Sequence, residues 1–232
     1  MMKLLKNKKL VLLLLAIALV LLAAAGPALA MLGSVTGVKT NAFTLEDDIR
    51  AVLREPNWTA AEKKEGLLLV PGKVVRKDPM ITNTCGIEEY AAIRLVFQYG
   101  SGNVKMSDAD LRKLLGLLEI DWHPDWVLCA GSNAAASATQ PLVFYYNGVI
   151  APGKTTPPLF SAIRVKDQSN GMTEADLRWL QGIKITDGDI VADPSGIGTF
   201  NIKIEGAAVQ ALGYGSAAAA KDDLKALFPA TP

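Results

Sequence analysis

Short runs of alternating or continuous apolar residues, separated by turn residues, dominate the chain beyond residue 66. The clearest run is Tyr90–Tyr99, which reads Y-A-A-I-R-L-V-F-Q-Y and is rich in the aromatic and branched residues that strands favour. A second run, Lys73–Thr82, contains Pro79, which limits this predicted strand to a sheet edge or a bulge. The further predicted strands are Trp126–Ala130, Pro141–Tyr146, Leu159–Val165 and Phe200–Leu212.

Helical spacing occurs in a few places only. Ser107 is a predicted N-cap, and the leucines that follow it share one helix face. These are Leu111, Leu114, Leu115 and Leu118. Thr173 caps a short helix that ends at Gln181, and Ser216 starts an alanine-rich helix, Ala217–Phe228, before Pro229.

Turn residues separate the predicted strands. Pro71-Gly72 has the order that a type II turn needs, because proline sets the first φ and glycine accepts the positive second one. A second pair, Pro152-Gly153, separates two later strands. Many strands with helices too few for βαβ units predict a mainly β fold, an antiparallel β-sandwich with a few helical insertions and a C-terminal helix.

The first 30 residues follow a different pattern. Four lysines precede an almost unbroken apolar run, Val11–Ala25, after which Ala28 and Ala30 form the small-x-small pattern that signal peptidases read. We predict that a signal peptide ends here and that the working protein begins at Met31. A membrane anchor is the alternative, since the run is long enough to cross a bilayer of about 30 Å. Pro27 beside the cleavage pattern favours processing.

The segment after the leader, residues 31–45, is predicted to be extended. Its Val35–Phe43 stretch is rich in Gly and Thr with loosely alternating apolar residues, so it has little to bury by itself. Without the leader 202 residues remain, enough for one domain with a substantial core. We therefore assign residues 46–232 to a single sandwich domain.

Charge and cysteine content limit the choice of partners and compartment. Loss of the four leader lysines leaves 20 basic residues against 23 acidic ones, a net charge near −3. This balance gives no electrostatic reason to expect a nucleic acid or an anionic membrane as partner. After export, Cys85 and Cys129 are candidates for a single disulfide, and two small packed thiols are the alternative.

Two motifs with chemical meaning are incomplete. Gly148–Thr155 reads G-V-I-A-P-G-K-T and formally fits a phosphate loop, but Pro157 and Pro158 prevent the helix that such a loop must open. We interpret this segment as a turn between strands. His123 is the only histidine, and no H-E-x-x-H pattern is present. We expect no catalytic, cofactor-binding or metal-ligating residue.

Several segments occur in a distinctive order along most of the chain. They are Ala28-Leu29-Ala30, Asn41–Thr44, Val70–Pro79, Asn83, Tyr90–Arg94, Phe144–Gly148, Pro152-Gly153, Thr155–Phe160 and Ile202–Ala211. In this order they resemble the TasA/camelysin family of exported proteins, which are fibre subunits of bacterial biofilm matrices with archaeal pilus relatives. The two cysteines and the lack of an obvious metal cluster depart from the family.

The resemblance implies a jelly-roll-type sandwich, removal of the leader by a dedicated signal peptidase, and homopolymeric fibres outside the cell, with minor fibre or anchoring subunits as further partners. In such fibres the freed N-terminal segment completes the sheet of a neighbouring subunit. Residues 31–45 suit this donor role because an extended segment adds backbone hydrogen bonds to an open sheet edge. Head-to-tail donation does not close on itself and builds a filament. The apolar donor residues are Val35, Val38, Ala42 and Phe43.

Two other functions are compatible with the sequence. A camelysin-like metal-dependent endopeptidase would use His123 together with carboxylates. A monomeric surface adhesin or glycan-binding sandwich would present exposed tryptophans as its platform. Filament formation by the processed protein distinguishes the structural role from both.

Overall fold

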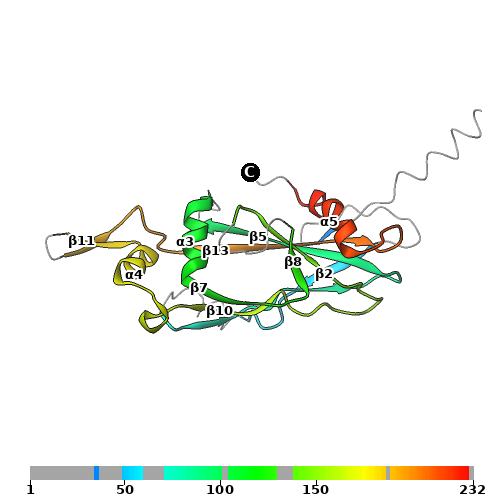
Figure 1. Cartoon of the computed structure of the whole chain (residues 1–232), viewed down its shortest axis with the longest axis horizontal. Helices are drawn as coiled ribbons and strands as arrows, with labels where there is room; N and C mark the ends of the chain where they lie inside the picture. The colour runs from blue at the N-terminus through cyan, green and yellow to red at the C-terminus, as the bar shows by residue number, and fades with distance from the viewer. Residues whose placement is uncertain are drawn as a thin grey trace, which may run out of the picture. The chain divides into compact units, whose positions relative to one another are not determined.

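The computed structural model describes residues 34–36, 49–59, 71–100, 104–129, 138–186 and 189–229. Contacts divide the chain into two units, Met1–Leu32 and Gly33–Pro232, and all described residues belong to the second. This unit is an antiparallel β-sandwich with three α-helices among its described residues (Figure 1). The mainly β sandwich predicted from the sequence is therefore confirmed.

The larger sheet has the strand order β1-β13-β5-β9-β8, with β6 beside β5, and all its pairs are antiparallel. Its strands are β1 (Ser34–Thr36), β5 (Glu89–Tyr99), β6 (Val104–Lys105), β8 (Trp126–Leu128), β9 (Leu142–Tyr146) and β13 (Phe200–Gln210). The two longest strands, β5 and β13, pair along their whole length of 11 residues. The predicted strands at these places are confirmed to within a few residues.

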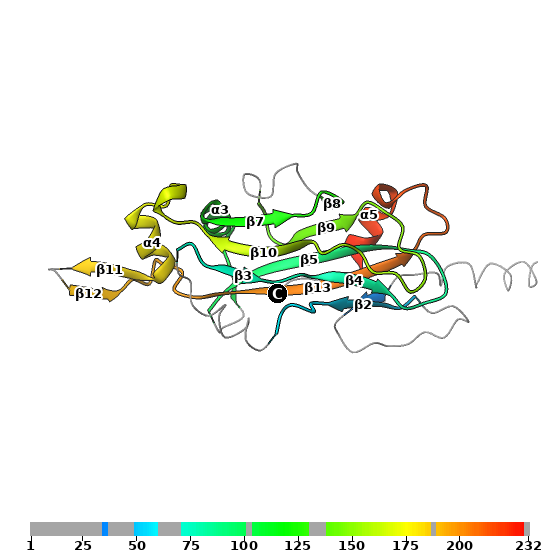
Figure 2. The same cartoon turned by 90° about the horizontal axis from the view of Figure 1, so that it is seen from below.

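Shorter strands form the opposite layer. The order β3-β10-β7 joins Val74–Arg76, Phe160–Val165 and Leu118–Trp122. Beside them, β2 (Ala51–Arg54) pairs with β4 (Met80–Asn83). A separate hairpin, β11 (Ile183–Thr186) with β12 (Asp189–Ala192), lies at the end of the sandwich away from the C-terminal helix (Figures 1 and 2). This hairpin was not predicted from the sequence.

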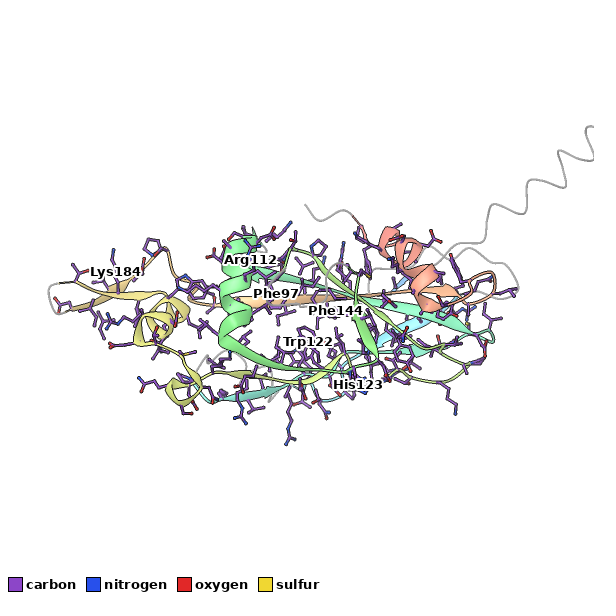
Figure 3. All side chains as sticks on the ribbon, in the orientation of Figure 1. Phe97, Arg112, Trp122, His123, Phe144 and Lys184 are labelled. Carbon is purple, nitrogen blue, oxygen red and sulfur yellow. The ribbon has the colours of Figure 1, made fainter. Side chains whose placement is uncertain are left out.

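The main core lies between the two layers. Trp122 of β7 stacks on Phe144 of β9 with ring centroids 4.8 Å apart, and it meets Phe160 of β10 edge-on at 5.4 Å. Figure 3 places Trp122 and Phe144 in the space between the layers. Inward-facing residues of β5, among them Ile93 and Phe97, are fully buried in the same core.

Three capped helices complete the unit. Helix α3 (Asp108–Leu117) begins at Ser107, whose side chain accepts a hydrogen bond from the Asp110 amide, and α4 (Glu174–Gln181) begins with a capping box at Thr173. Helix α5 (Ala217–Ala226) follows the N-cap Ser216. A 3-10 turn, η3, covers Gln168–Asn170. All three predicted helix starts are confirmed.

The end of the first predicted helix is one correction. Leu118 was expected on the helix face, but its backbone is extended and it begins β7 directly after α3. Its side chain is still buried in the core. Apolar spacing therefore identified a core residue but not the change from helix to strand.

The predicted strand Lys73–Thr82 is a second correction, because it is two strands in different sheets. The break falls at Lys77–Pro79, where proline cannot donate to a ladder. Buried polar side chains hold the bend: Asp78 accepts hydrogen bonds from the amide and side chain of Asn57, and Lys77 Nζ lies 2.7 Å from Glu55 Oε1. The chain thus crosses from one short sheet to the other.

Helix α5 covers part of the outer face of the larger sheet, so most of β5 and residues 205–209 of β13 are buried on both faces (Figure 1). Alanines 217 and 220 and Leu224 of the helix meet Ala92 of β5 and Ala207 of β13 in a second apolar cluster. The Pro-Gly turns are also confirmed, with positive φ angles of 75° at Gly72 and 70° at Gly153. The second turn ends in a bridge at Thr155, as the interpretation of that segment as a turn requires.

Candidate assembly site

The short strand β1 forms one edge of the larger sheet. Ser34, Val35 and Thr36 lie opposite Ala208, Ala207 and Gly206 of β13 in antiparallel register. β1 has three residues and β13 has 11. On this side of β13, no strand within the described residues pairs with Phe200–Glu205, although β5 pairs with the whole strand on the other side. We call Phe200–Glu205 the open edge of β13.

Burial changes along β13 at the point where β1 ends. Residues 205–209 are buried, whereas Phe200, Ile202 and Ile204 are half-buried and alternate with exposed polar residues. These three side chains pack against the main core from the same face of the strand. A strand edge with ladder groups still to be paired is a template for another strand. The arrangement can therefore accept a further extended segment.

Small residues explain how β13 is built at the β1 end. Ala207 packs under α5 and Ala208 faces the main core on the other side of the sheet, and both alanines are 0% exposed. Next to them, Glu205 forms ion pairs with Arg94 and Lys203 at 2.5 and 3.0 Å. Sequence reasoning predicted a donor segment but did not indicate the strand edge with which it would pair. The available signal was the alternation of apolar and polar residues over Phe200–Glu205, inside a segment already predicted to be a strand.

The structure tests few of the predicted site residues. Val35 lies in β1, opposite Ala207. The cleavage residues Ala28, Ala30 and Met31 lie outside the described residues, as do the donor residues Val38, Ala42 and Phe43. Cleavage and donation by these residues stay predictions.

The two cysteines are free thiols, so the alternative of two packed thiols describes them and the candidate disulfide is not formed. Cys85 lies in the turn before β5, and Cys129 follows β8 and packs beside the cluster under α5. Burial raises the pKa of both thiols above the ordinary value. In the structure each sulfur therefore acts as a packed, protonated group.

A buried polar cluster surrounds Cys85. Its Sγ lies 3.1 Å from Asn83 Oδ1 and 3.2 Å from Glu89 Oε1. Glu89 is 0% exposed, and its Oε2 has no hydrogen-bond partner among the described residues. Burial raises the pKa of Glu89, although hydrogen bonds from Cys85 and from the Arg50 backbone act in the opposite direction. The cluster favours a protonated carboxyl group.

His123 lies in the turn between β7 and β8, about one-third exposed, with Nδ1 3.8 Å from Asp125 Oδ2 and accepting a hydrogen bond from the Asp125 amide (Figure 3). Within the described part of the chain, no group of three histidine, cysteine or carboxylate side chains is arranged to hold a metal ion. The structure thus gives the endopeptidase alternative no ligand set among these residues.

The tryptophans do not form an exposed platform, which corrects the expectation behind the adhesin alternative. Trp126 is buried and donates from its indole nitrogen to the Pro157 carbonyl at 3.0 Å. Trp58, Trp122 and Trp179 are half-buried, and lysine ammonium groups cover the rings of Trp58 and Trp179. Their apolar surfaces are used for packing within the chain.

Comparison with protein-family models, curated proteins and solved structures finds no match to this chain. Among the helices of the described residues, none is both long and apolar enough to cross a membrane.

Proposed function

We propose that this chain is a secreted structural protein that assembles into extracellular fibres, with the N-terminal segment of one copy bound along the open edge of β13 in the next. The role needs backbone pairing and shape, and no catalytic residue. The observation that supports it is the mismatch between the three residues of β1 and the 11 residues of β13.

The register of β1, extended along β13, supports the proposed donor residues. Continued along β13, it sets Val38 opposite Ile204 and Ala42 opposite Phe200. Ile204 and Phe200 face the core and are half-buried, so apolar donor residues there would complete their burial. Polar Lys39 and Asn41 would fall on the outer face, opposite Lys203 and Asn201, which are exposed.

Chain length favours donation between copies. Ala51 lies at the Gln210 end of the sandwich. It pairs with Asn83, and the Asn83 side chain donates to the Ile150 carbonyl. Ile150 bridges to Glu89, which pairs with Gln210. If one copy paired its own segment through Ala42, the chain would have to return along β13, about 33 Å for ten steps. The nine steps from Ala42 to Ala51 reach at most about 32 Å in a straight, fully extended line, and a chain that must also reverse its direction reaches less. Full pairing is therefore open to the segment of another copy.

Electron microscopy of the exported product of the full chain tests the proposal. We expect filaments, and we expect none when residues 31–45 are deleted, because the open edge then has no donor. Dispersed particles from the complete exported product, or the same filaments after the deletion, would contradict donation by this segment.

Cross-linking tests the register directly. In a background with both native cysteines replaced by alanine, chains with Val35→Cys are mixed with chains carrying Ala207→Cys, and disulfide dimers are measured on non-reducing gels. We expect dimers, since the two positions are directly opposed. Ala92→Cys is the matched control, because Ala92 faces α5 like Ala207 but lies one strand further away. Equal cross-linking at both positions would argue against strand exchange.

A further inference from the structure

The β11–β12 hairpin presents an apolar face that is half-buried at Ile183 and exposed further out. Ile185 pairs with Ile190 and Ile183 with Ala192, so all four lie on one face of the two-stranded sheet. Ile185 is 49% exposed and Ile190 is 70% exposed. Figure 3 shows the hairpin, marked by Lys184, extending beyond the sandwich.

The base of the hairpin is firmly attached. The Asp193 amide donates to the Gly182 carbonyl at 2.7 Å, and the Ile197 amide donates to the Trp179 carbonyl at 2.8 Å. The exposed part, by contrast, is an isolated two-stranded sheet, which is marginally stable in water without a covering partner. An anchored hairpin with exposed isoleucines on one face is therefore typical of a contact surface.

The direction of strand donation identifies what lies next to this surface. A donor segment pairs from Ser34 beside Ala208 toward Ala42 beside Phe200, so it leaves the acceptor at the Phe200 end. The hairpin precedes Phe200 in the chain and lies at that same end (Figures 1 and 2). The donor's own domain must begin within about 25 Å of this point, since only seven steps separate Ala42 from Ile49.

We propose that the apolar face of the hairpin, formed by Ile183, Ile185, Ile190 and Ala192, packs against the domain of the donor subunit, a second copy of this chain. This inference depends on the proposed fibre function and adds a second contact to the exchanged strand. The end of the donor domain where β2 begins carries apolar surface for it: Leu212 is 79% exposed and Val149 is 43% exposed. Backbone hydrogen bonds locate both residues at this end of the domain. The Ala211 amide, next to Leu212, donates to the Glu88 carbonyl, and Ile150, next to Val149, exchanges hydrogen bonds with Glu89.

Substitutions on the two faces of the hairpin test the contact in the exported full chain. Ile190→Asp places a charge on the apolar face, and Val191→Asp makes the same change on the neighbouring residue, which is 37% exposed on the opposite face. Sedimentation assays measure the critical concentration for filaments. We expect Ile190→Asp to raise it about tenfold or more, the loss expected when one buried isoleucine contact is removed, and Val191→Asp to leave it nearly unchanged.

The outcomes separate this contact from strand donation. If wild-type filaments form and both variants match wild type, the hairpin contact is wrong and the donor strand stands. If both variants raise the critical concentration equally, a general effect of charge replaces the specific contact. If wild-type protein forms no filaments, both proposals fail together. Thermal melting followed by circular dichroism checks that each variant folds. Ile190→Thr, which keeps the β-branched side chain, should raise the critical concentration by a smaller factor than Ile190→Asp.

Discussion

Arg94 and Glu205 lie directly opposite each other on β5 and β13 and form a buried ion pair on the face of the sheet that α5 covers. Arg94 Nε and Nη2 lie 2.6 and 2.5 Å from Glu205 Oε2, and the two residues are 4% and 3% exposed. The guanidinium also donates to the Pro229 carbonyl at 2.5 Å and lies over the ring of Phe228. One side chain thus joins the two longest strands to the C-terminal end of α5.

Removing one partner of this pair should cost far more stability than removing both. We expect Arg94→Met to lower the free energy of unfolding by about 3 kcal/mol, because buried Glu205 then keeps only the exposed Lys203 as a partner. The double variant Arg94→Met, Glu205→Met should recover a large part, measured by urea unfolding. A double variant as unstable as Arg94→Met alone would show that packing against Phe228, and not charge burial, decides the cost.

Glu89 should make stability fall as the pH rises. Its pKa is raised in the folded protein, so its contribution is fully present below the pKa of the unfolded chain and is lost as the pH rises through the folded-state pKa. We expect Glu89→Gln to flatten this part of the profile, with its advantage over wild type growing between those two pKa values. Thermal melting at a series of pH values from acidic to mildly alkaline measures the difference. A difference independent of pH would contradict the assignment.

Asp121 stabilises a bulge in β10. The register of β10 against β7 shifts between Phe160 and Ile163, and Asp121 Oδ1 accepts from the amides of Ser161 and Ala162 at 3.1 and 2.9 Å. Burial alone would raise the pKa of Asp121, but hydrogen bonds from the Ser161 side chain and these amides outweigh it and lower the pKa.

Replacing this carboxylate should therefore weaken the sheet. We expect Asp121→Asn to cost about 1 kcal/mol at neutral pH, a modest figure because the group is exposed. The wild-type advantage should be lost as the pH falls through the lowered folded-state pKa, since protonation removes the acceptor. Urea unfolding at neutral and acidic pH measures both effects, and an advantage that persists at acidic pH would argue against the carboxylate.

Gly196 should tolerate no side chain. A Cβ there would lie 2.6 Å from Gly182 Cα and from the Trp179 carbonyl oxygen, at the base of the hairpin. We expect Gly196→Ala to destabilise the protein by about 1–3 kcal/mol, because backbone must move. Gly86→Ala is the matched control, since no atom lies within 4 Å of its Cβ position. Equal melting temperatures for the two variants would contradict the close contact.

The cysteines should titrate as thiols. We expect two reactive thiols per chain in denaturant, and a melting temperature unaffected by reductant, because no disulfide links Cys85 to Cys129. In the native state their reaction with alkylating reagents should be slow at neutral pH, since burial raises both pKa values. If the denatured exported protein has no reactive thiol, the two cysteines form a disulfide and the prediction is wrong.

Local signals in the sequence predicted local structure well. Ser107 and Thr173 cap helices where the pattern of polar and apolar residues indicated, and Tyr90–Tyr99 is part of β5, one of the two longest strands. The same signals missed the split at Pro79 and the β11–β12 hairpin, because each depends on which distant strand a short segment meets. The sequence also predicted a donor segment and the strand Phe200–Leu212, but not which edge of that strand stays open, because this depends on the pairing of distant strands.

What the sequence determined by itself was most of the strands, the Pro-Gly turns and the capped helices, and from it we also predict an extended N-terminal segment. These features depend on spacing and on residue type within a few positions. Tertiary structure decided which strands are neighbours, placing Glu205 beside Arg94, 111 residues away, and leaving Phe200–Glu205 open on one side within the described residues. Strand pairing is non-local, so the edge on which the proposed function depends exists only once the sheet has formed.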